Sequence, residues 1–385
     1  MRVCLVTLDF PPFRSSGLTI YAENLARGLA ERGYAVTVVA AERPKPVDSL
    51  PMPTNVSTVF VPVGRTDWLG LGWQAARYLH AVQGSFDIVH FTDVHFAFAY
   101  RGPFVASAFQ SFRQRLTSHH GQPYHTSRRN YAFRLTYYNV ARWLLEQPSV
   151  RRARYILMAS RATQEEFVTH YHADPRRISL VYSGIDLRRF ANLPSRDEAR
   201  RHLGLADDVP TLLYIGFSTP RKGVEYLAQA LDRMRTPAQM LMVGKWEAGY
   251  QARFLAAAGE ARARVRMVGY VPEAEVLSYF AAADALVFPT LLEGFGYPPA
   301  EAMAAGLPVV TTTAWTAGEL AADAALIVPP ADSAALADAL DRVLSEPGLA
   351  ERLRQAGRER AYRCFDLSQA VVQTEAIYEL VAGVG

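Results

Sequence analysis

The sequence predicts an α/β protein built from two doubly wound domains, each with a parallel sheet covered on both faces. The chain has 385 residues, half of them hydrophobic, and this length suits two cores of similar size better than one. Short apolar runs alternate along it with amphipathic helical stretches. Such alternation is typical of parallel sheets whose strands are buried on both sides.

The first half of the chain shows the alternation from its start. An apolar run at 3–8 is followed by a Pro-Pro turn, then by a helical pattern at 20–32 that ends at Gly33, and then by a second apolar run at 35–40. Strand, helix and strand in this order predict a parallel pair. Further strands are expected at 87–91, 103–108, 155–160 and 178–182.

A domain boundary is expected after the strand at 178–182. Ser183-Gly-Ile-Asp186 and the polar run that continues to Asp208 are interpreted as a linker. We therefore expect an N-terminal domain over 1–186 and a second domain over 187–365. The second half repeats the alternation more cleanly, with strands expected at 211–216, 238–244, 265–269, 285–290 and 307–313.

A last helix is expected over 366–385. Asp366 is a suitable N-terminal cap for it. Five apolar side chains are expected to share its buried face: Val372, Ala376, Ile377, Leu380 and Val381.

Composition narrows the class of protein. No apolar run approaches the roughly 18 residues of a membrane span, and the opening MRVCLVTLDFPP has too short an apolar core for a signal peptide. Two cysteines, Cys4 and Cys364, do not suffice for a disulfide framework. We therefore expect a cytoplasmic protein.

Positive charge is concentrated in residues 101–154. This segment holds ten arginines and one acid, Glu146, so it carries +9 while the rest of the chain carries −5. Aromatic residues are interleaved with the arginines. Two interpretations stay open: contact with an anionic partner, such as the inner face of a membrane or a phosphorylated acceptor, or an ordinary helix surface with aromatics inward and arginines outward.

Two glutamates eight positions apart form the most informative motif, Glu293-Gly-Phe-Gly-Tyr-Pro-Pro-Ala-Glu301. It follows an expected strand and leads into an expected helix. Gly294 and Gly296 leave backbone amides free to approach a ligand. A glutamate near a helix N-terminus is also favoured by the helix dipole without any ligand, but the pair of glutamates with both glycines indicates a binding turn.

A second candidate turn, Gly216-Phe-Ser-Thr-Pro-Arg-Lys-Gly223, follows the strand expected at 211–216. A departing diphosphate needs its growing negative charge offset, and fixed cations beside a helix N-terminus can do this without a metal ion. Arg221 and Lys222 are the candidates. The chain has just three lysines, which favours a specific role for Lys222 over a solvated charged turn.

These motifs resemble those of the retaining glycosyltransferases of the two-domain GT-B fold, in the branch called family 4, whose signature is Glu-x7-Glu. The resemblance extends over nearly the whole chain and implies two Rossmann-like domains facing across a cleft, with the C-terminal helix packing back on the N-terminal domain. The segments that carry it, besides the signature, are Phe10-Pro-Pro, Ser16-Gly17, Asp87-Ile-Val-His90, Ser183-Gly-Ile-Asp186, Gly269-Tyr-Val-Pro272 and Glu319.

The resemblance implies roles for individual residues. It places Glu293 by the transferred sugar and Glu301 on the ribose hydroxyls, with Arg221 and Lys222 on the diphosphate. Other donor contacts are implied for Ser16, Gly17, Gly216, Val271, Gly294, Phe295 and Gly296. The chain departs from the family at Phe217, where many relatives have an arginine, so Arg221 is expected to compensate.

On the acceptor side the family pattern is less complete. Many relatives have a histidine near the donor sugar after the strand at 103–108, whereas this chain has Gln110 there. Gln110, His119 and His120 are the acceptor-binding candidates. His119, His120 and His125 form a cluster that lacks further ligands at metal-binding spacing. No Asp-x-Asp triplet occurs in the sequence, so we expect no metal and no cofactor.

The sequence thus predicts a retaining, metal-independent hexosyltransferase that uses a UDP-, GDP- or ADP-sugar. A nucleotide-sugar epimerase or a phosphorylase of the same fold is an alternative. A basic nucleic-acid-binding protein is a further alternative, but it would leave Glu293, Glu301 and the Arg221-Lys222 turn unexplained. We expect no nucleic-acid partner.

Overall fold

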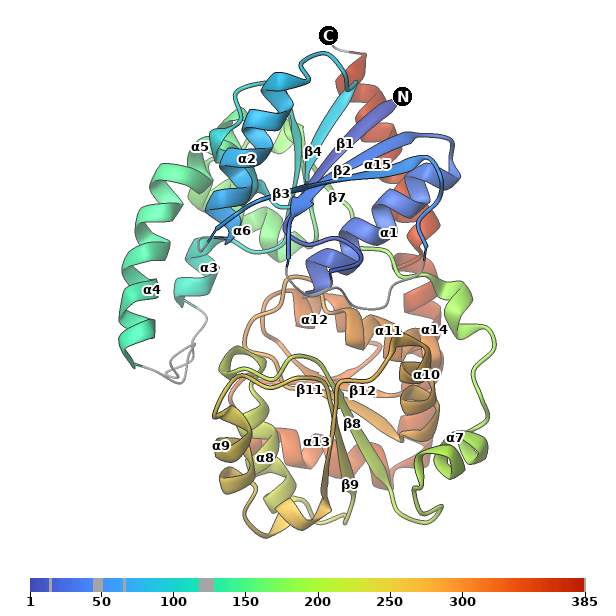
Figure 1. Cartoon of the computed structure of the whole chain (residues 1–385). Helices are drawn as coiled ribbons and strands as arrows, with labels where there is room; N and C mark the ends of the chain where they lie inside the picture. The colour runs from blue at the N-terminus through green and yellow to red at the C-terminus, as the bar shows by residue number, and fades with distance from the viewer. Residues whose placement is uncertain (14–15, 44–50, 65–66, 118–127, 384–385) are drawn as a thin grey trace. The chain divides into compact units, whose positions relative to one another are not determined.

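The computed structural model of the chain describes residues 1–13, 16–43, 51–64, 67–117 and 128–383, without the side chains of residues 128–131 and 133. The chain forms two compact units (Figure 1). Unit 1 comprises Met1–Arg113, Tyr138–Asp186 and Phe365–Gly385, and unit 2 comprises Gln114–Tyr137 and Leu187–Cys364.

Unit 1 is built on a seven-stranded parallel sheet in the order β3-β2-β1-β4-β5-β6-β7. The strands are β1 (Arg2–Thr7), β2 (Ala35–Ala41), β3 (Val56–Val61), β4 (Ile88–Phe91), β5 (Val105–Ala108), β6 (Tyr155–Met158) and β7 (Ile178–Leu180). In register, Val3 of β1 lies between Val36 of β2 and Ile88 of β4. The strand order therefore reverses direction between β1 and β4, which makes this the switch point of the sheet.

Helices cover this sheet on both faces (Figure 1). They are α1 (Gly17–Glu31), α2 (Asp67–Ala81), η1 (Val94–Ala99), α5 (Gln147–Arg152), α6 (Arg161–Tyr171), η3 (Pro175–Arg177) and α15 (Leu367–Ala382). Helix α3 (Phe112–Thr117) begins in unit 1, and its residues from Gln114 onward belong to unit 2. A long helix, α4 (Arg128–Ala141), continues through one π-helical turn, η2 (Arg142–Glu146), into α5.

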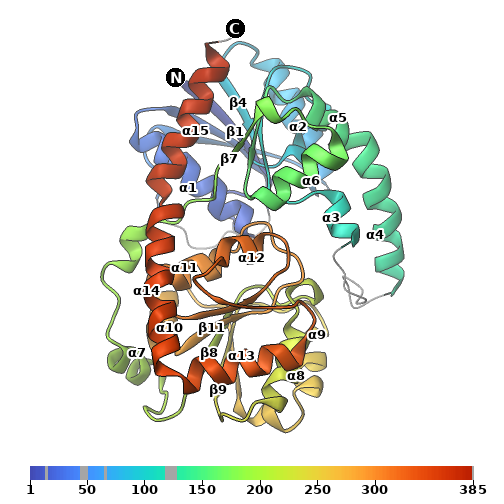
Figure 2. The same ribbon diagram turned by 180° about the vertical axis from the view of Figure 1, so that it is seen from behind.

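Helix α15 returns the end of the chain to unit 1, where it packs along α1 (Figure 2). Asp366 caps it as predicted, since its carboxylate accepts a hydrogen bond of 2.9 Å from the Ser368 amide. The predicted buried face is wrong except for Ile377. The helix is rotated because the Tyr378 hydroxyl bonds to the buried His90 ring (2.5 Å) and Val371 packs against Gly28 of α1.

Unit 2 contains a six-stranded parallel sheet in the order β10-β9-β8-β11-β12-β13. Its strands are β8 (Thr211–Ile215), β9 (Gln239–Val243), β10 (Val265–Gly269), β11 (Ala285–Phe288), β12 (Val309–Thr312) and β13 (Leu326–Val328). Each strand predicted for the second half is present. Here the strand order reverses between β8 and β11.

Helices also cover both faces of the second sheet, with α8 and α9 on one side and α10 and α14 on the other (Figure 1). The helices of this unit are η4 (Leu187–Phe190), α7 (Arg196–Leu203), η5 (Pro220–Lys222), α8 (Val224–Arg233), α9 (Tyr250–Ala257), η6 (Gly259–Arg264), α10 (Glu273–Ala282), α11 (Tyr297–Ala305), α12 (Thr316–Ala321), α13 (Ser333–Ser345) and α14 (Pro347–Cys364).

The polar run to Asp208 was predicted to be a linker, but it contains helix α7. Ser195 and Glu198 form a capping box at its start, in which the Ser195 hydroxyl accepts from the Glu198 amide and the Glu198 carboxylate accepts from the Ser195 amide (3.0 Å). Arg200 is fully buried and donates to the carbonyl oxygens of Val209 (2.7 Å) and Ala282 (2.9 Å). These bonds tie the helix to the body of unit 2.

A buried polar network follows the carboxyl end of β4 in unit 1. The His95 ring is 4% exposed and lies between two carboxylates, bonding Asp93 through Nδ1 and Glu146 through Nε2 (2.7 Å). Glu146 also accepts from the Phe112 amide (3.1 Å) and from the Tyr171 hydroxyl. Burial alone would lower the pKa of His95, but the two carboxylates outweigh it and raise the pKa to about 9.

The protonation of His95 is therefore expected to stabilise unit 1. Because the folded pKa of about 9 lies above the ordinary value of 6.5, the stabilisation is complete below pH 6.5 and is lost as the pH rises through 9. His95→Gln should lower the free energy of unfolding by about 3 kcal/mol at acidic pH and by much less above pH 9. Urea denaturation at both pH values measures the difference.

His80→Gln is the matched control, because His80 lies exposed on α2 of the same unit. It should change the free energy of unfolding little at either pH. An equal loss of stability for His95→Gln at both pH values would contradict a charged His95.

Candidate functional site

The candidate site of unit 2 lies at the switch point of its sheet. Strands β8 and β11 are adjacent and parallel, with Leu212 beside Ala285, so the turns that follow them leave the same edge of the sheet. These turns are 216–223 and 289–296. In open α/β sheets ligands bind beyond the carboxyl ends of the strands at such a point.

Backbone contacts join the two turns. The Leu291 amide donates to the Arg221 carbonyl oxygen (2.8 Å), and the Arg221 guanidinium donates to the Leu292 carbonyl oxygen (3.1 Å). Gly223 makes this approach possible: its φ is +64°, and a Cβ there would lie 2.0 Å from the Pro289 carbonyl oxygen. Glycine is therefore required at this position.

Lys222 and Glu293, one from each turn, form an ion pair. Both side chains are largely buried, with 11% and 13% of their surface exposed. The Lys222 ammonium also lies 4.8 Å from the centroid of the Phe288 ring, as in a cation–π contact. A cation from one turn and a carboxylate from the other are thus in direct contact.

The pair is ionised at neutral pH. Burial lowers the pKa of Lys222 to about 8 against the opposing effect of Glu293, so the ammonium remains mostly protonated at pH 7. Burial also raises the pKa of Glu293, but Lys222, Arg221 and the Gly294 amide (3.1 Å) together bring it below its ordinary value. An anionic ligand that entered here would meet Arg221 and Lys222 in a poorly hydrated setting, where charge interactions are strong.

The turn after Glu293 leads directly into α11. Gly294, Phe295 and Gly296 are buried, and Gly296 has a φ of +105°, which favours glycine. Glu301 was expected near the N-terminus of this helix, yet it is the fifth residue and lies in the second turn. The dipole of the helix N-terminus therefore does not account for a glutamate at this position.

Arg189 holds the Glu301 carboxylate. Its guanidinium lies 3.4 Å from Glu301 and 3.1 Å from Glu273 of α10. Arg189 was not predicted as a site residue, because it lies in the segment expected to be a linker and because Arg189 and Glu301 are 112 positions apart. The only local signal was the arginine pair that follows Ser183-Gly-Ile-Asp186.

The remaining donor-binding candidates of unit 2 lie along the same edge of the sheet. Gly216 directly follows β8, and its amide donates to Val243 of β9 (3.0 Å). The backbone at Gly244 passes close to Gly216, since a Cβ on Gly244 would lie 2.1 Å from the Gly216 carbonyl oxygen. Val271 is half-buried two residues after β10. Phe217, which stands where relatives have an arginine, is half exposed.

The candidates of unit 1 are also found after strands. Ser16 and Gly17 are exposed at the start of α1, and Gln110 is half-buried just after β5. His119 and His120 lie outside the described residues.

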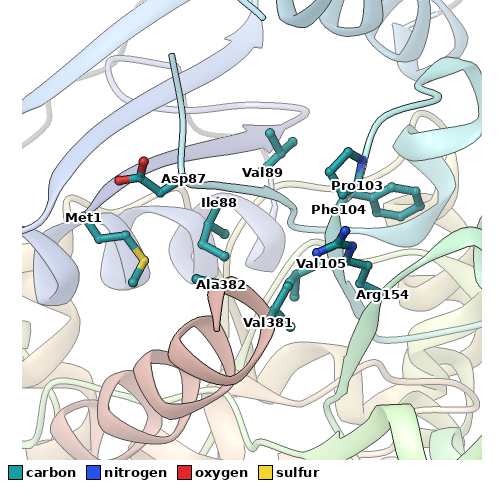
Figure 3. Close-up of a pocket in the computed structure, with 10 residues that line it drawn as sticks. All are labelled: Met1, Asp87, Ile88, Val89, Pro103, Phe104, Val105, Arg154, Val381 and Ala382. Atoms are coloured by element: carbon teal, nitrogen blue, oxygen red, sulfur yellow. The ribbon is translucent and has the colours of Figure 1, made fainter. Parts of the chain in front are cut away.

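A cavity of about 590 Å³ lies at the opposite edge of the unit 1 sheet. The amino ends of β4 and β5, Met1 and the last turn of α15 form its walls (Figure 3). Arg154 points its guanidinium toward Phe104 and Val381, whereas the Asp87 carboxylate points away from Arg154 and pairs with Arg2 (3.0 Å). None of the predicted site residues lines this cavity.

The described part of the chain lacks two kinds of feature. It contains no group of three or more histidine, cysteine, aspartate or glutamate side chains arranged to hold a metal ion. No helix among residues 1–13, 16–43, 51–64, 67–117 and 128–383 is both long and apolar enough to cross a membrane.

Comparison with known proteins places both units in known families. Residues 15–189 match the model of Glycosyltransferase Family 4, and residues 195–360 match the model of the glycosyl transferases group 1. The MMP alpha-(1->4)-mannosyltransferase of Mycolicibacterium hassiacum is 26% identical over 98% of this chain and 98% of its own length.

Solved structures agree in fold. Sucrose-phosphate synthase from Thermosynechococcus elongatus superposes with a TM-score of 0.83 at 21% identity, covering 100% of both chains. Anabaena HepE in complex with UDP-glucose gives a TM-score of 0.73 at 17% identity, also over 100% of both chains. The two family models together span most of the sequence, and the chain belongs to the family 4 glycosyltransferases, with two Rossmann-like units of the GT-B fold.

Proposed function

We propose that this glycosyltransferase moves a hexose-type sugar from a nucleotide-diphosphate sugar to an acceptor hydroxyl, without a metal ion and with retention of the anomeric configuration. The observation that carries the proposal is the buried Lys222–Glu293 pair, with Arg221 beside it, at the switch point of unit 2. A diphosphate that leaves a sugar needs fixed positive charge nearby, and these residues supply it within a preorganised turn.

The donor would be held by both turns and by α11. The carboxylate of Glu301, fixed by Arg189, suits the two hydroxyls of a ribose because an ionised carboxylate accepts hydrogen bonds at both oxygens. The amides of Gly294, Phe295 and Gly296 are assigned to the sugar and the diphosphate. Backbone near Val271 and Gly216 is assigned to the nucleotide, and Ser16 and Gly17 to the phosphates.

The chemical step needs no protein nucleophile. The bond from the anomeric carbon to the diphosphate oxygen breaks, and its electron pair leaves with the diphosphate beside Lys222 and Arg221. The acceptor oxygen attacks the anomeric carbon from the same face, and its proton passes to the departing phosphate oxygen. The Glu293 carboxylate stabilises the positive charge that develops on the sugar. It also keeps Lys222 in place.

The donor nucleotide is proposed to be UDP, GDP or ADP, and the neighbour HepE is solved with UDP-glucose. Gln110, His119 and His120 are proposed as the contacts of the acceptor. A small molecule, a glycan or a lipid-linked sugar would each present a suitable hydroxyl. The reaction is proposed to take place in the cytoplasm, where nucleotide sugars are the donors, with no cofactor.

Removal of either charge of the pair should impair turnover. Lys222→Met and Glu293→Gln are each expected to lower kcat about 100-fold or more, because each removes charge that acts in the transition state. Initial rates with the identified donor, measured in the presence of EDTA, test this. Melting temperatures show whether the variants fold, since each substitution leaves the other charge buried without its partner.

Glu346→Gln is the matched control. Glu346 directly follows α13 in the same unit and pairs with Arg342 of that helix (3.3 Å) at the surface, so its loss should leave kcat unchanged. Normal turnover by both Lys222→Met and Glu293→Gln would show that the site has been misassigned.

Retention of configuration is tested on the product. NMR of the new glycosidic linkage should show the same anomeric configuration as in the donor, because attack occurs on the face from which the diphosphate leaves. An inverted linkage would exclude this mechanism. Release of free sugar, sugar phosphate or an epimerised nucleotide sugar, with no transfer to an acceptor, would instead favour a phosphorylase or an epimerase.

A further inference from the structure

An apolar surface lies on the helical stretch that joins α4, η2 and α5 in unit 1. Val140, Trp143 and Leu144 are 51%, 55% and 68% exposed. Together with the exposed Arg151 they form what we call the Trp143 face. The face differs from an ordinary amphipathic helix, in which large apolar side chains point to the core.

The buried network of unit 1 enforces this exposure. Glu146, the last residue of η2, is held inside by His95, Tyr171 and the Phe112 amide. Leu144 precedes Glu146 by two residues and therefore lies on nearly the opposite side of the helix. Rotating the helix so that Leu144 is buried would remove the charged Glu146 carboxylate from its hydrogen-bond partners, and this costs free energy. The exposed apolar residues are thus fixed by the fold.

Arg151 supplies the positive charge of this face, whereas Arg142, two residues before Leu144, is partly buried on the inner side of the helix. The Arg142 guanidinium lies 4.7 Å from the centroid of the Trp143 ring and donates to the His170 carbonyl oxygen (3.3 Å). Arg151 is exposed about two turns further along. The one acid of the segment 101–154 is Glu146, which is buried and paired. The segment therefore presents positive charge without an exposed carboxylate.

We propose that the Trp143 face binds the surface of an anionic lipid bilayer. Trp, Leu and Val side chains gain free energy when they enter the boundary between head groups and acyl chains, while arginines remain with the phosphates. A nucleic acid would meet the arginines but would leave Leu144 and Val140 in water. A second copy would bring like charges together. The lipid surface accounts for both kinds of residue.

Co-sedimentation of the full chain with lipid vesicles tests this proposal. The protein is expected to bind vesicles of phosphatidylcholine with about 30% phosphatidylglycerol and to bind pure phosphatidylcholine far more weakly. Binding should weaken at about 0.5 M salt, where charge interactions are screened. Trp143→Ala and Leu144→Ser should each lower the partition coefficient about tenfold, and Arg151→Gln about fivefold.

Leu380→Ser is the matched control, because Leu380 is 54% exposed on α15 of the same unit. It should leave vesicle binding unchanged. Absence of binding to anionic vesicles would overturn the proposal, and so would equal partition of Leu144→Ser and the unaltered protein. Dimer formation can be measured by sedimentation equilibrium, and DNA binding by a mobility-shift assay. If Leu144→Ser abolishes either of these while vesicle binding persists, the proposal is also overturned.

Discussion

The ion pair of Lys222 and Glu293 is the interaction on which the catalytic assignment of this glycosyltransferase depends. Removing two charges from water costs several kcal/mol per ion, and mutual attraction offsets this only when the geometry is good. A pair of well-packed apolar residues would serve the stability of unit 2 at least as well. A buried pair at the carboxyl edge of a sheet is therefore better explained by chemistry than by folding.

The backbone of both turns is arranged around this pair. Gly223 lets the turn after β8 pass against the carbonyl of Pro289, and Arg221 fastens the two turns together through Leu291 and Leu292. These bonds fix Lys222 and Glu293 before any ligand enters. A site organised in advance loses little free energy to reorganisation when charge moves in the transition state. Glu301 is likewise held in place before a ligand enters, because Arg189 pairs with its carboxylate.

Unit 1 also depends on a buried polar group. His95 joins Asp93, which follows β4, to Glu146, which ends the π-helical turn. This link sets the rotation of the helix that carries Trp143 and Leu144. A contact between residues 51 positions apart thus determines which side chains of the arginine-rich segment face the solvent.

The strands of both sheets were predictable because buried parallel strands are short apolar runs, visible without any partner. β3 and β13 were not predicted. Most residues of β3 are exposed or half-buried, so it lacks a continuous apolar run, and β13 is a short run that follows an alanine-rich stretch. The turns at 216–223 and 289–296 were predictable because their glycine, lysine and glutamate residues can be identified in the local sequence. Arg189, the His95 network and the rotation of α15 were not predicted, because each is set by contacts between residues far apart in the sequence.

One measurement tests most directly whether the paired turns of unit 2 hold a nucleotide diphosphate. Thermal unfolding should be followed with UDP, GDP or ADP, or with their sugars, in the presence of EDTA. At about 100 times its dissociation constant, one of these ligands should add about 2.7 kcal/mol to the free energy of unfolding. A raised melting temperature is expected with at least one ligand and without a metal ion. No shift with any of them would contradict it.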